Sequence, residues 1–513
     1  MSLGRTYAVA LMGLDGSLIE VEADIGQSLP NFVILGLPDA SLNESRDRIR
    51  AAAKNAGIAL SARKITVNLI PASLPKRGSG FDLAILMAAL RANGDIRDTG
   101  TTVFLSEVGL DGRLRPVRGV LPSVIAAVAA GHLDMVVARE NLAEAKLVPG
   151  VRVRGFDSVA ATLLHFGANP KELIMPAVGR LAPDVEPVPS LAEPRRLDMA
   201  DIAGQAEPRF AVEIAAAGAH HLMMMGPPGA GKTMLAERLP GILPDLSDSH
   251  AMEATAIHSI SGAAASCTEL LRRPPFENPH HSATPAAIIG GGSGIPRPGA
   301  ASRAHRGVLF LDEAPEYERR VLDALRQPLE SGSLVLHRAV GTASYPARFQ
   351  LVLAANPCPC GLASGKGVDC TCTAQQRRRY FGRISGPLLD RVDLQLTVQR
   401  VSMADYSTFT DAETTATVAN RVSEARAAQR ERLRPWGLWT NSEVPGTVLK
   451  KELKLPESVL RPLNEAMRRE TITARGYDRV LKVAWTMGDL RGLTQPGADE
   501  ILEAQQLRQQ VAS

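Results

Sequence analysis

One stretch, HLMMMGPPGAGKTML at residues 221–235, restricts the possible folds of this sequence more than any other. Its apolar start predicts a strand, its Gly and Pro residues predict a tight loop, and the residues from Gly231 predict a helix. The loop matches the pattern G-x-x-x-x-G-K-[ST] from Gly226 to Thr233, which binds phosphate groups. The alternative is a glycine-rich turn that contains Lys-Thr by chance, and the flanking strand and helix argue against it. We therefore expect an α/β nucleotide-binding core.

The chemistry of a bound nucleotide explains the residue types in this loop. Glycines allow backbone N–H groups to approach phosphate oxygens without an intervening Cβ. Lys232 would place a positive charge near the β and γ phosphates, and the hydroxyl of Thr233 suits Mg²⁺. The predicted cofactors are ATP and Mg²⁺, and the predicted nucleotide-binding residues are Gly226, Pro227, Pro228, Gly229, Ala230, Gly231, Lys232, Thr233 and Met234.

Two further apolar runs end on polar residues that suit hydrolysis. The run GVLFLDEAPE ends on Asp312 and Glu313. Asp312 is predicted to bind Mg²⁺, and Glu313 is predicted to act as the base that activates the attacking water. The run FQLVLAAN ends on Asn356, whose amide could orient that water. Acidic residues and Asn are also common at ordinary strand ends, so these assignments depend on the phosphate loop that precedes them.

The whole sequence has the composition of an ordinary globular protein. Its 513 residues suggest two to four domains, and 45% of them are hydrophobic and 22% charged. We expect neither a signal peptide nor a membrane span, because no apolar run reaches about 18 residues. Few cysteines and no export signal predict the reducing cytoplasm. The net charge of +4 permits nucleic-acid binding without requiring it.

The distribution of proline and of strand-like runs predicts three domains. Prolines recur through residues 169–195, which we interpret as a linker. The alternation of strand-like and helical runs before the linker predicts an α/β domain over residues 1–168. A second α/β block, the nucleotide-binding core, is expected over residues 196–400. The remaining residues, 401–513, are rich in Glu, Arg, Ala and Leu and predict a helical domain.

Four of the five cysteines, Cys358, Cys360, Cys370 and Cys372, lie in a glycine-rich loop over residues 356–373. Four thiolates are the composition of a closed structural Zn²⁺ site. The C-x-C spacing is tighter than the common C-x₂-C pattern and is therefore less specific. Four free thiols or a disulfide pair are the alternatives, and a reducing compartment disfavours the disulfide. We expect zinc to fix this loop.

The motifs GPPGAGKT, LFLDE, LAANPCPCG and RISGPLLDRVDL occur in this order. With them the sequence closely resembles the ComM/YifB-type magnesium-chelatase-like AAA+ ATPases, over nearly its whole length. The resemblance implies an AAA+ αβα core with a C-terminal helical lid, and a hexameric ring with ATP sites between subunits. It also implies an ATP-driven helicase that moves single-stranded or branched DNA during natural transformation.

The resemblance assigns catalytic roles to two arginines. Arg391, in LLDRVD, matches the arginine finger that acts on the ATP of the neighbouring subunit. A salt bridge to Asp390 or Asp393 is the alternative use of this residue. Arg479 matches the sensor arginine of the lid, and its spacing from Arg475 and Lys482 predicts one shared helix face, which could also be a plain solvated surface.

Two insertions typical of the chelatase branch suggest contacts with DNA. AAIIGGGSGIPRPGAASRAHRG predicts a loop, and GSLVLHRAVGTASYPARF alternates like a hairpin. In related rings such elements project into the central channel. The candidate phosphate contacts, which rest on this analogy, are Arg297, Arg303, His337 and Arg338.

The N-terminal domain resembles the fold of Lon proteases, through LPKRGSGFDLAI and SEVGLDGRLRPVRGVLPSVIAA. Peptidase chemistry of that type needs a Ser nucleophile and a Lys base. The nucleophile position falls on Gly80, next to Ser79, and the two usual lysine positions fall on Leu121 and Ser123. We therefore expect a non-catalytic domain that assembles the ring or guides DNA.

Two other functions compete with a DNA-translocating ring. A metal-chelatase motor would share the ATP core but would not be expected to carry the Lon-like domain. A protein-remodelling ATPase or Lon-like protease is the second alternative, and the missing Ser–Lys pair counts against proteolysis.

Overall fold

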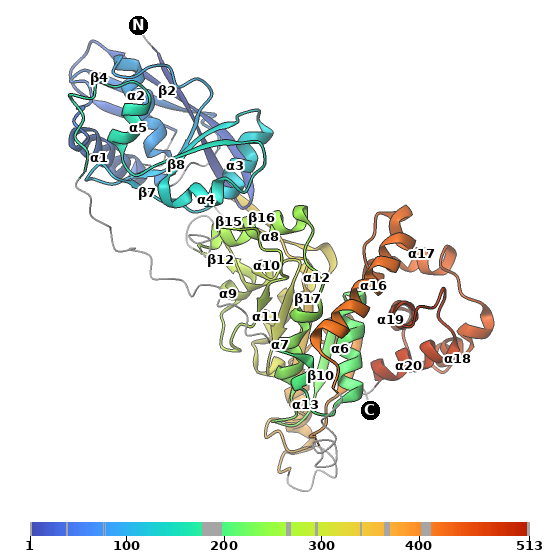
Figure 1. Cartoon of the computed structure of the whole chain (residues 1–513). Coiled ribbons are helices and arrows are strands. Elements are labelled where there is room, and N and C mark those ends of the chain that lie inside the picture. The colour runs from blue at the N-terminus through green and yellow to red at the C-terminus, as the bar shows by residue number, and fades with distance from the viewer. Residues whose placement is uncertain are drawn as a thin grey trace.

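The computed structural model describes residues 3–36, 39–74, 76, 78–176, 197–262, 268–292, 296–338, 341–363, 370–401 and 412–509. These residues form an N-terminal α/β unit, a central α/β core and a C-terminal helical lid (Figure 1). The predicted fold class is confirmed. Most of the predicted linker, Ala339 in the second insertion, and Cys267 lie outside the described residues.

The N-terminal unit is a seven-stranded sheet in the order β3-β4-β2-β1-β5-β8-β9. In β4 every second residue is buried, as expected for a sheet with one face on the core. Its larger strands are β1 (Gly4–Met12), β2 (Asp15–Gly26), β3 (Phe32–Leu35), β4 (Lys64–Ile70), β5 (Val103–Leu105), β8 (Asp134–Ala138) and β9 (Arg152–Phe156), with a small pair β6 (Glu107–Val108) and β7 (Leu114–Arg115). Its helices are α1 (Asp39–Asn55), α2 (Asp82–Asn93), α3 (Val120–Ala129), α4 (Leu142–Ala145) and α5 (Val159–His165).

The central core is a five-stranded parallel sheet in the order β11-β14-β17-β10-β18. The strands are β10 (Leu222–Met225), β11 (Phe276–Glu277), β14 (Val308–Leu311), β17 (Gln350–Ala355) and β18 (Leu394–Thr397). Strands β14 and β17 are buried along their whole length, as expected for a sheet covered on both faces. Nucleotide-binding loops are expected at the carboxyl ends of such strands.

Alternation along β10 divides the residues between the two faces of this sheet. Leu222 and Met224 pack with helix α6 (Ala206–Gly218) and the lid, whereas Met223 packs with the opposite layer. The other helices of the core are α7 (Lys232–Ile242), α8 (Asp248–Ser261), α9 (Pro285–Ile289), α10 (Ala300–Arg303), α11 (Arg319–Ala324), α12 (Arg326–Ser331), α13 (Ala374–Phe381) and α14 (Gly386–Leu389).

The two insertions form neighbouring strand pairs, and the first, which was predicted to be a loop, also contains most of α9 and all of α10. One joins β12 (Gly290–Gly291) to β13 (Arg297–Pro298), and the other joins β15 (Ser333–Arg338) to β16 (Gly341–Pro346). The predicted hairpin in the second insertion is confirmed. The hydroxyl of Tyr345 on β16 donates to the carbonyl oxygen of Pro296 at 2.5 Å, which ties the two hairpins together.

The lid consists mainly of α16 (Thr415–Leu433), α17 (Gly446–Lys451), α18 (Glu457–Arg468), α19 (Ala474–Leu490) and α20 (Ala498–Gln509). Its apolar side shares one continuous core with α6 and β10. No helix in the described part of the chain is long and apolar enough to cross a membrane.

Candidate nucleotide site and cysteine cluster

The structure explains why glycine occupies three positions of the phosphate loop, and the explanation differs between them. Gly229 and Gly231 have φ angles of +75° and +90°, a backbone region that favours glycine. A Cβ on Gly226 would lie 2.1 Å from the carbonyl oxygen of Val398, so the neighbouring backbone leaves no room for a larger residue at this position. The predicted nucleotide-binding residues Gly226 to Met234 span the loop after β10 and the first turn of α7.

Lys232 is buried at the first turn of α7, and its ammonium group turns back over the loop. It donates hydrogen bonds to the carbonyl oxygens of Gly226 and Pro227 at 2.7 and 3.0 Å, and to Oδ1 of Asn356 at 3.2 Å. Burial lowers the pKa of Lys232, although the nearby carboxylates of Asp312 and Glu313 oppose this shift. The loop lysine and the predicted water-orienting amide are thus brought together.

The two predicted magnesium ligands also meet. The hydroxyl of Thr233 donates to Oδ2 of Asp312 at 2.8 Å, and the other carboxylate oxygen of Asp312 accepts the backbone N–H of Glu313 at 2.8 Å. Mg²⁺ prefers hard oxygen ligands of this kind, often one or two from protein with the rest from water and phosphate. These residues therefore fit Mg²⁺.

Glu313, the predicted base, adopts a left-handed conformation with φ of +51° and has a half-exposed side chain. Its Oε2 lies 3.0 Å from Nδ1 of His281, which sequence reasoning missed. The paired histidines in the segment NPHHS were the available signal. The hydroxyl of Tyr317 donates to the carbonyl oxygen of Pro279 and so anchors the segment that carries His281.

The two candidate catalytic arginines lie at the other end of the strands. Leu222 pairs with Leu394 and Met225 with Thr397, so the residues before β18 lie opposite the phosphate loop. Arg391 pairs with Glu330 and also donates to the carbonyl oxygen of Pro387 at 2.5 Å. Its ion-pair partner is therefore neither of the aspartates named in the alternative.

Positive charge accumulates around Arg391. Burial and the nearby guanidinium groups of Arg326, Arg475 and Arg479 lower its pKa. Arg391 also lines an open pocket together with Asp323, Arg326 and Glu330. The carboxylates of Asp323 and Glu330 balance part of this positive charge, so another anion would have to displace Glu330 to pair with Arg391.

Arg479 forms an ion pair with Asp393, whose side chain is 2% exposed. Burial alone would raise the pKa of Asp393, but Arg479 and the ring of His220, whose Nδ1 lies 3.5 Å from Oδ2, outweigh it and hold that pKa well below its usual value. On the same helix, Arg475 is exposed, whereas Lys482 donates to the carbonyl oxygen of Ser442 at 2.8 Å. Arg479 therefore has a structural partner within its own chain.

The candidate DNA contacts divide into two groups. Arg297 and Arg338 are exposed and lie close together, because Arg297 pairs with Gly291 and the Arg338 guanidinium lies next to Gly291. His337 is exposed beside Arg338 and contacts Thr342 at 3.0 Å. Arg303 differs, since it forms a bidentate ion pair with Glu277 at 3.0 and 2.8 Å.

The positions expected for Lon chemistry have other partners in this structure. The Ser79 hydroxyl donates to the Glu107 carboxylate, and the Ser123 hydroxyl donates to the carbonyl oxygen of Gly119 at 2.7 Å. The ammonium group of the buried Lys76 donates to backbone carbonyls, including that of Leu74 at 3.1 Å. Within the described residues, neither serine is paired with a lysine.

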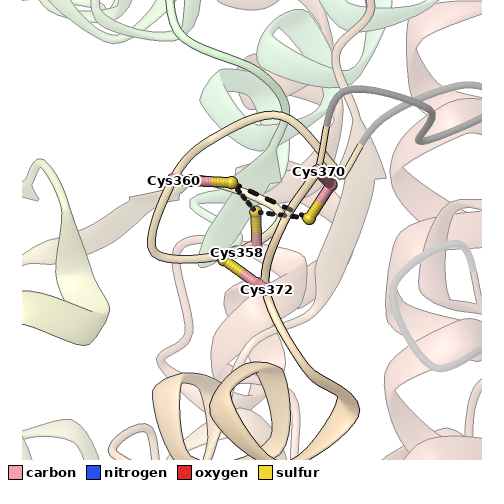
Figure 2. A group of neighbouring side chains, drawn as sticks. All are labelled: Cys358, Cys360, Cys370 and Cys372. Atoms are coloured by element: carbon pink, nitrogen blue, oxygen red, sulfur yellow. Dashed lines mark hydrogen bonds between the residues drawn. The ribbon is translucent and has the colours of Figure 1, made fainter.

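The four clustered cysteines converge, with their sulfur atoms within 4.8 Å of one another (Figure 2). Cys358 is buried, and its Sγ lies 3.2 Å from that of Cys360 and 3.7 Å from that of Cys370. These separations exceed a disulfide bond of about 2.05 Å, and all four thiols are free. Zn–S bonds of about 2.3 Å place tetrahedral ligands about 3.8 Å apart, so the cluster fits zinc. The pKa of Cys360 is lowered to about 6. The largest cause is a hydrogen bond from the Leu362 backbone, and hydrogen bonds from the other thiols contribute less.

Three family models match the chain. "Magnesium chelatase, subunit ChlI" matches residues 198–406, "Subunit ChlI of Mg-chelatase" matches residues 21–141, and "Magnesium chelatase, subunit ChlI C-terminal" matches residues 412–508. The N-terminal unit thus also matches a model named after the chelatase, so its presence does not by itself argue against a chelatase motor.

Two partial relatives bear on the alternatives. The magnesium-chelatase 38 kDa subunit of Cereibacter sphaeroides is 28% identical over 30% of this chain and 51% of its own length. The Lon protease of Mycolicibacterium smegmatis is 27% identical over 28% of this chain and 20% of its own length.

Other relatives cover nearly the whole chain. An uncharacterized protein of Mycobacterium tuberculosis is 49% identical over 99% of both chains. Competence protein ComM of Haemophilus influenzae is 38% identical over 98% of this chain and 97% of its own. The uncharacterized protein YifB of Escherichia coli is 39% identical over 96% and 94%. Since these similarities extend from the N-terminal unit to the lid, the chain belongs to the ComM/YifB-type magnesium-chelatase-like family of AAA+ proteins.

Proposed function

We propose that this chain is an ATP-hydrolysing motor that assembles as a hexameric ring and moves branched or single-stranded DNA, as a ComM-like branch-migration helicase in natural transformation or recombination. The single observation that carries the proposal is the near-complete alignment with a competence protein, at 38% identity. The assembled phosphate loop and Asp-Glu strand end support ATP hydrolysis as the energy source.

Residues of one copy would bind and orient the nucleotide. Lys232 would exchange its loop carbonyl partners for phosphate oxygens, and Thr233 and Asp312 would hold Mg²⁺, which would neutralise charge on the phosphates. Glu313 accepts the proton of the attacking water, and Asn356 helps to orient that water. The contact between Asn356 and Lys232 supports this placement of the amide.

A second copy would supply the arginines. Arg391 lies at the sheet edge opposite the phosphate loop, so it cannot reach the nucleotide of its own chain without a large rearrangement. Arg391 would meet the γ-phosphate of an adjacent subunit by exchanging its partner Glu330 for that phosphate, and Arg479 lies near Arg391. This arrangement favours a closed ring with head-to-tail contacts.

The paired hairpins are the proposed DNA-contacting elements. Arg297, His337 and Arg338 are exposed on them and would contact phosphates without reading the sequence. Arg303 is already paired with Glu277 and is not included in the proposed contacts.

We also propose that Cys358, Cys360, Cys370 and Cys372 bind one structural Zn²⁺ per chain. All four tetrahedral positions would be filled by thiolates, which excludes a catalytic role for this metal. Metal analysis of protein prepared without chelators should find about one zinc per chain, and loss of zinc in a Cys360→Ser/Cys370→Ser variant should follow.

A protein-remodelling ATPase and a chelatase motor remain the competing functions, and one experiment separates them from a DNA motor. ATP hydrolysis is measured with and without forked DNA, followed by salt titration of DNA binding. The proposal expects stimulation by DNA, and Arg338→Ala should flatten the salt dependence by about one unit of log–log slope. Arg461→Ala serves as the control, because Arg461 is an equally charged, 80% exposed side chain on α18 of the lid. Absence of DNA binding by the unmodified protein at low salt would contradict the proposal.

A further inference from the structure

The loop that carries the cysteines is attached to the nucleotide site at both ends. It begins at Asn356, whose side chain accepts a hydrogen bond from Lys232. It continues into α13, where the side chain of the buried Tyr380 lies beside the Asn356 backbone. Just after α13, Arg383 donates to the carbonyl oxygen of Pro315 at 2.9 Å, close to the predicted base Glu313. The position of this loop is therefore linked to three parts of the site.

The middle of the loop presses directly against the phosphate loop. Gly361 has a φ angle of +77°, and its backbone N–H donates to the carbonyl oxygen of Cys358 at 2.9 Å. A Cβ at position 361 would lie 2.7 Å from both Cγ and Cδ of Pro228. Pro228 belongs to the predicted nucleotide-binding residues, so the backbone of the cysteine loop packs directly against the phosphate loop.

The described part of the cysteine loop buries few apolar side chains that could stabilise its conformation. Cys358 is fully buried, but Cys360 is exposed and Leu362 is 40% exposed. A long loop with so little buried apolar surface is commonly ordered by a metal ion, whose binding energy replaces that of a hydrophobic core.

We infer that the metal held by the four cysteines fixes the phosphate loop in its nucleotide-binding shape, so that metal and nucleotide bind cooperatively. This inference rests on the zinc site proposed above. Coupling between two sites is reciprocal, so bound nucleotide must strengthen metal binding by the same factor.

The first experiment measures both sides of this coupling on the full chain. The dissociation constant of a fluorescent ADP analogue is determined for zinc-loaded and zinc-depleted protein, and zinc affinity is determined by chelator competition with and without ADP. We expect changes of about fivefold or more in both directions, a common size for coupling between sites. In Lys232→Ala, which lacks the phosphate-binding lysine, zinc affinity should not respond to the same ADP concentration.

A pair of glycine variants separates the contact from the metal. Gly361→Ala forces a Cβ into Pro228, whereas Gly131→Ala has a similar φ of +87° with nothing within 4 Å of the added Cβ. Gly361→Ala should retain one zinc per chain yet bind the ADP analogue about fivefold more weakly, whereas Gly131→Ala should bind it normally.

The outcomes distinguish the two proposals. Protein without zinc would overturn both the metal site and the coupling. Protein with zinc, whose ADP affinity is the same after zinc removal and in Gly361→Ala, would overturn only the coupling. If zinc removal unfolds the protein, the effect of ADP on zinc affinity and the Gly361→Ala measurement still decide the matter.

Discussion

At the carboxyl edge of the central sheet, Lys232, Thr233 and Asp312 surround an open loop, whereas at the amino edge Asp393 is buried in a closed ion pair with Arg479. The first edge has groups that suit phosphate and Mg²⁺. The second has clustered guanidinium groups, and burial lowers the pKa of Arg391 among them. The two edges thus differ in chemistry and lie at opposite ends of the strands, and on the proposed function a complete site would combine the carboxyl edge of one copy with the amino edge of another.

The largest expected effect comes from breaking the amino edge at Arg391. Arg391→Ala should lower ATP hydrolysis about 1000-fold, because arginine fingers contribute about 10³–10⁵ to the rate. Folding should survive, since its partner Glu330 is 64% side-chain exposed and can be solvated. Mixing Arg391→Ala with Lys232→Ala should restore some activity, because an intact phosphate loop then meets an intact arginine. Full activity of Arg391→Ala alone would show that both edges are not needed.

The next effect tests the carboxyl edge. Glu313→Gln should lower hydrolysis about 100-fold or more by removing the general base, while the binding of ATP is retained. Single-turnover hydrolysis and nucleotide titration measure the two properties separately. Glu316→Gln is the control, because Glu316 lies in the turn that follows Glu313 but pairs with Arg383 and is not among the predicted catalytic residues. Hydrolysis at the normal rate in Glu313→Gln would assign the base elsewhere.

Arg479 tests whether the amino edge is structural as well as catalytic. Arg479→Ala leaves the Asp393 carboxylate buried without its main partner, which should cost about 3–5 kcal/mol of the free energy of unfolding. Urea denaturation measures the loss, and Arg479→Met/Asp393→Asn should recover part of it. Arg475→Ala on the same helix should have little effect, because its side chain is 72% exposed. Unchanged stability of Arg479→Ala would indicate that the buried pair is dispensable.

The smallest effect concerns His281. His281→Gln should change hydrolysis by less than about fivefold, because both side chains of the His281–Glu313 pair are partly exposed and such pairs contribute about 1 kcal/mol or less. His280→Gln is the matched control. A loss of 100-fold would instead place His281 among the residues that orient the base.

The sequence predicted the carboxyl edge well because its information is local. A glycine-rich loop between a strand and a helix specifies the positions of Lys232 and Thr233 at the carboxyl edge of the sheet. An apolar strand that ends on Asp312 and runs parallel to the first places Asp312 at that edge as well. The α/β class and the β15–β16 hairpin were likewise predictable from alternation along short segments.

Contacts between distant segments were not predictable in the same way. The sheet order β11-β14-β17-β10-β18 differs from the chain order, and it alone brings Asp393 beside the strand that leads to the phosphate loop. The contact of His281 with Glu313 and that of Gly361 with Pro228 depend on the path of irregular loops. No periodicity encodes such paths.

The junction between the N-terminal unit and the core has a mechanical consequence. Glu144 of the N-terminal unit is buried and accepts a hydrogen bond from Ser259 of α8 at 2.5 Å. The turn after Met12 lies against β16, where a Cβ on Gly13 would be 2.7 Å from the carbonyl oxygen of Ser344. The N-terminal unit also contacts the end of the hairpin that carries Arg338, because a Cβ on Gly341, the register partner of Arg338, would lie 3.1 Å from Cε of Met12 (Figure 1). Because one hairpin both carries Arg338 and contacts the N-terminal unit, any shift of the hairpin relative to the sheet would have to be matched by a shift of the N-terminal unit or by a break in these contacts.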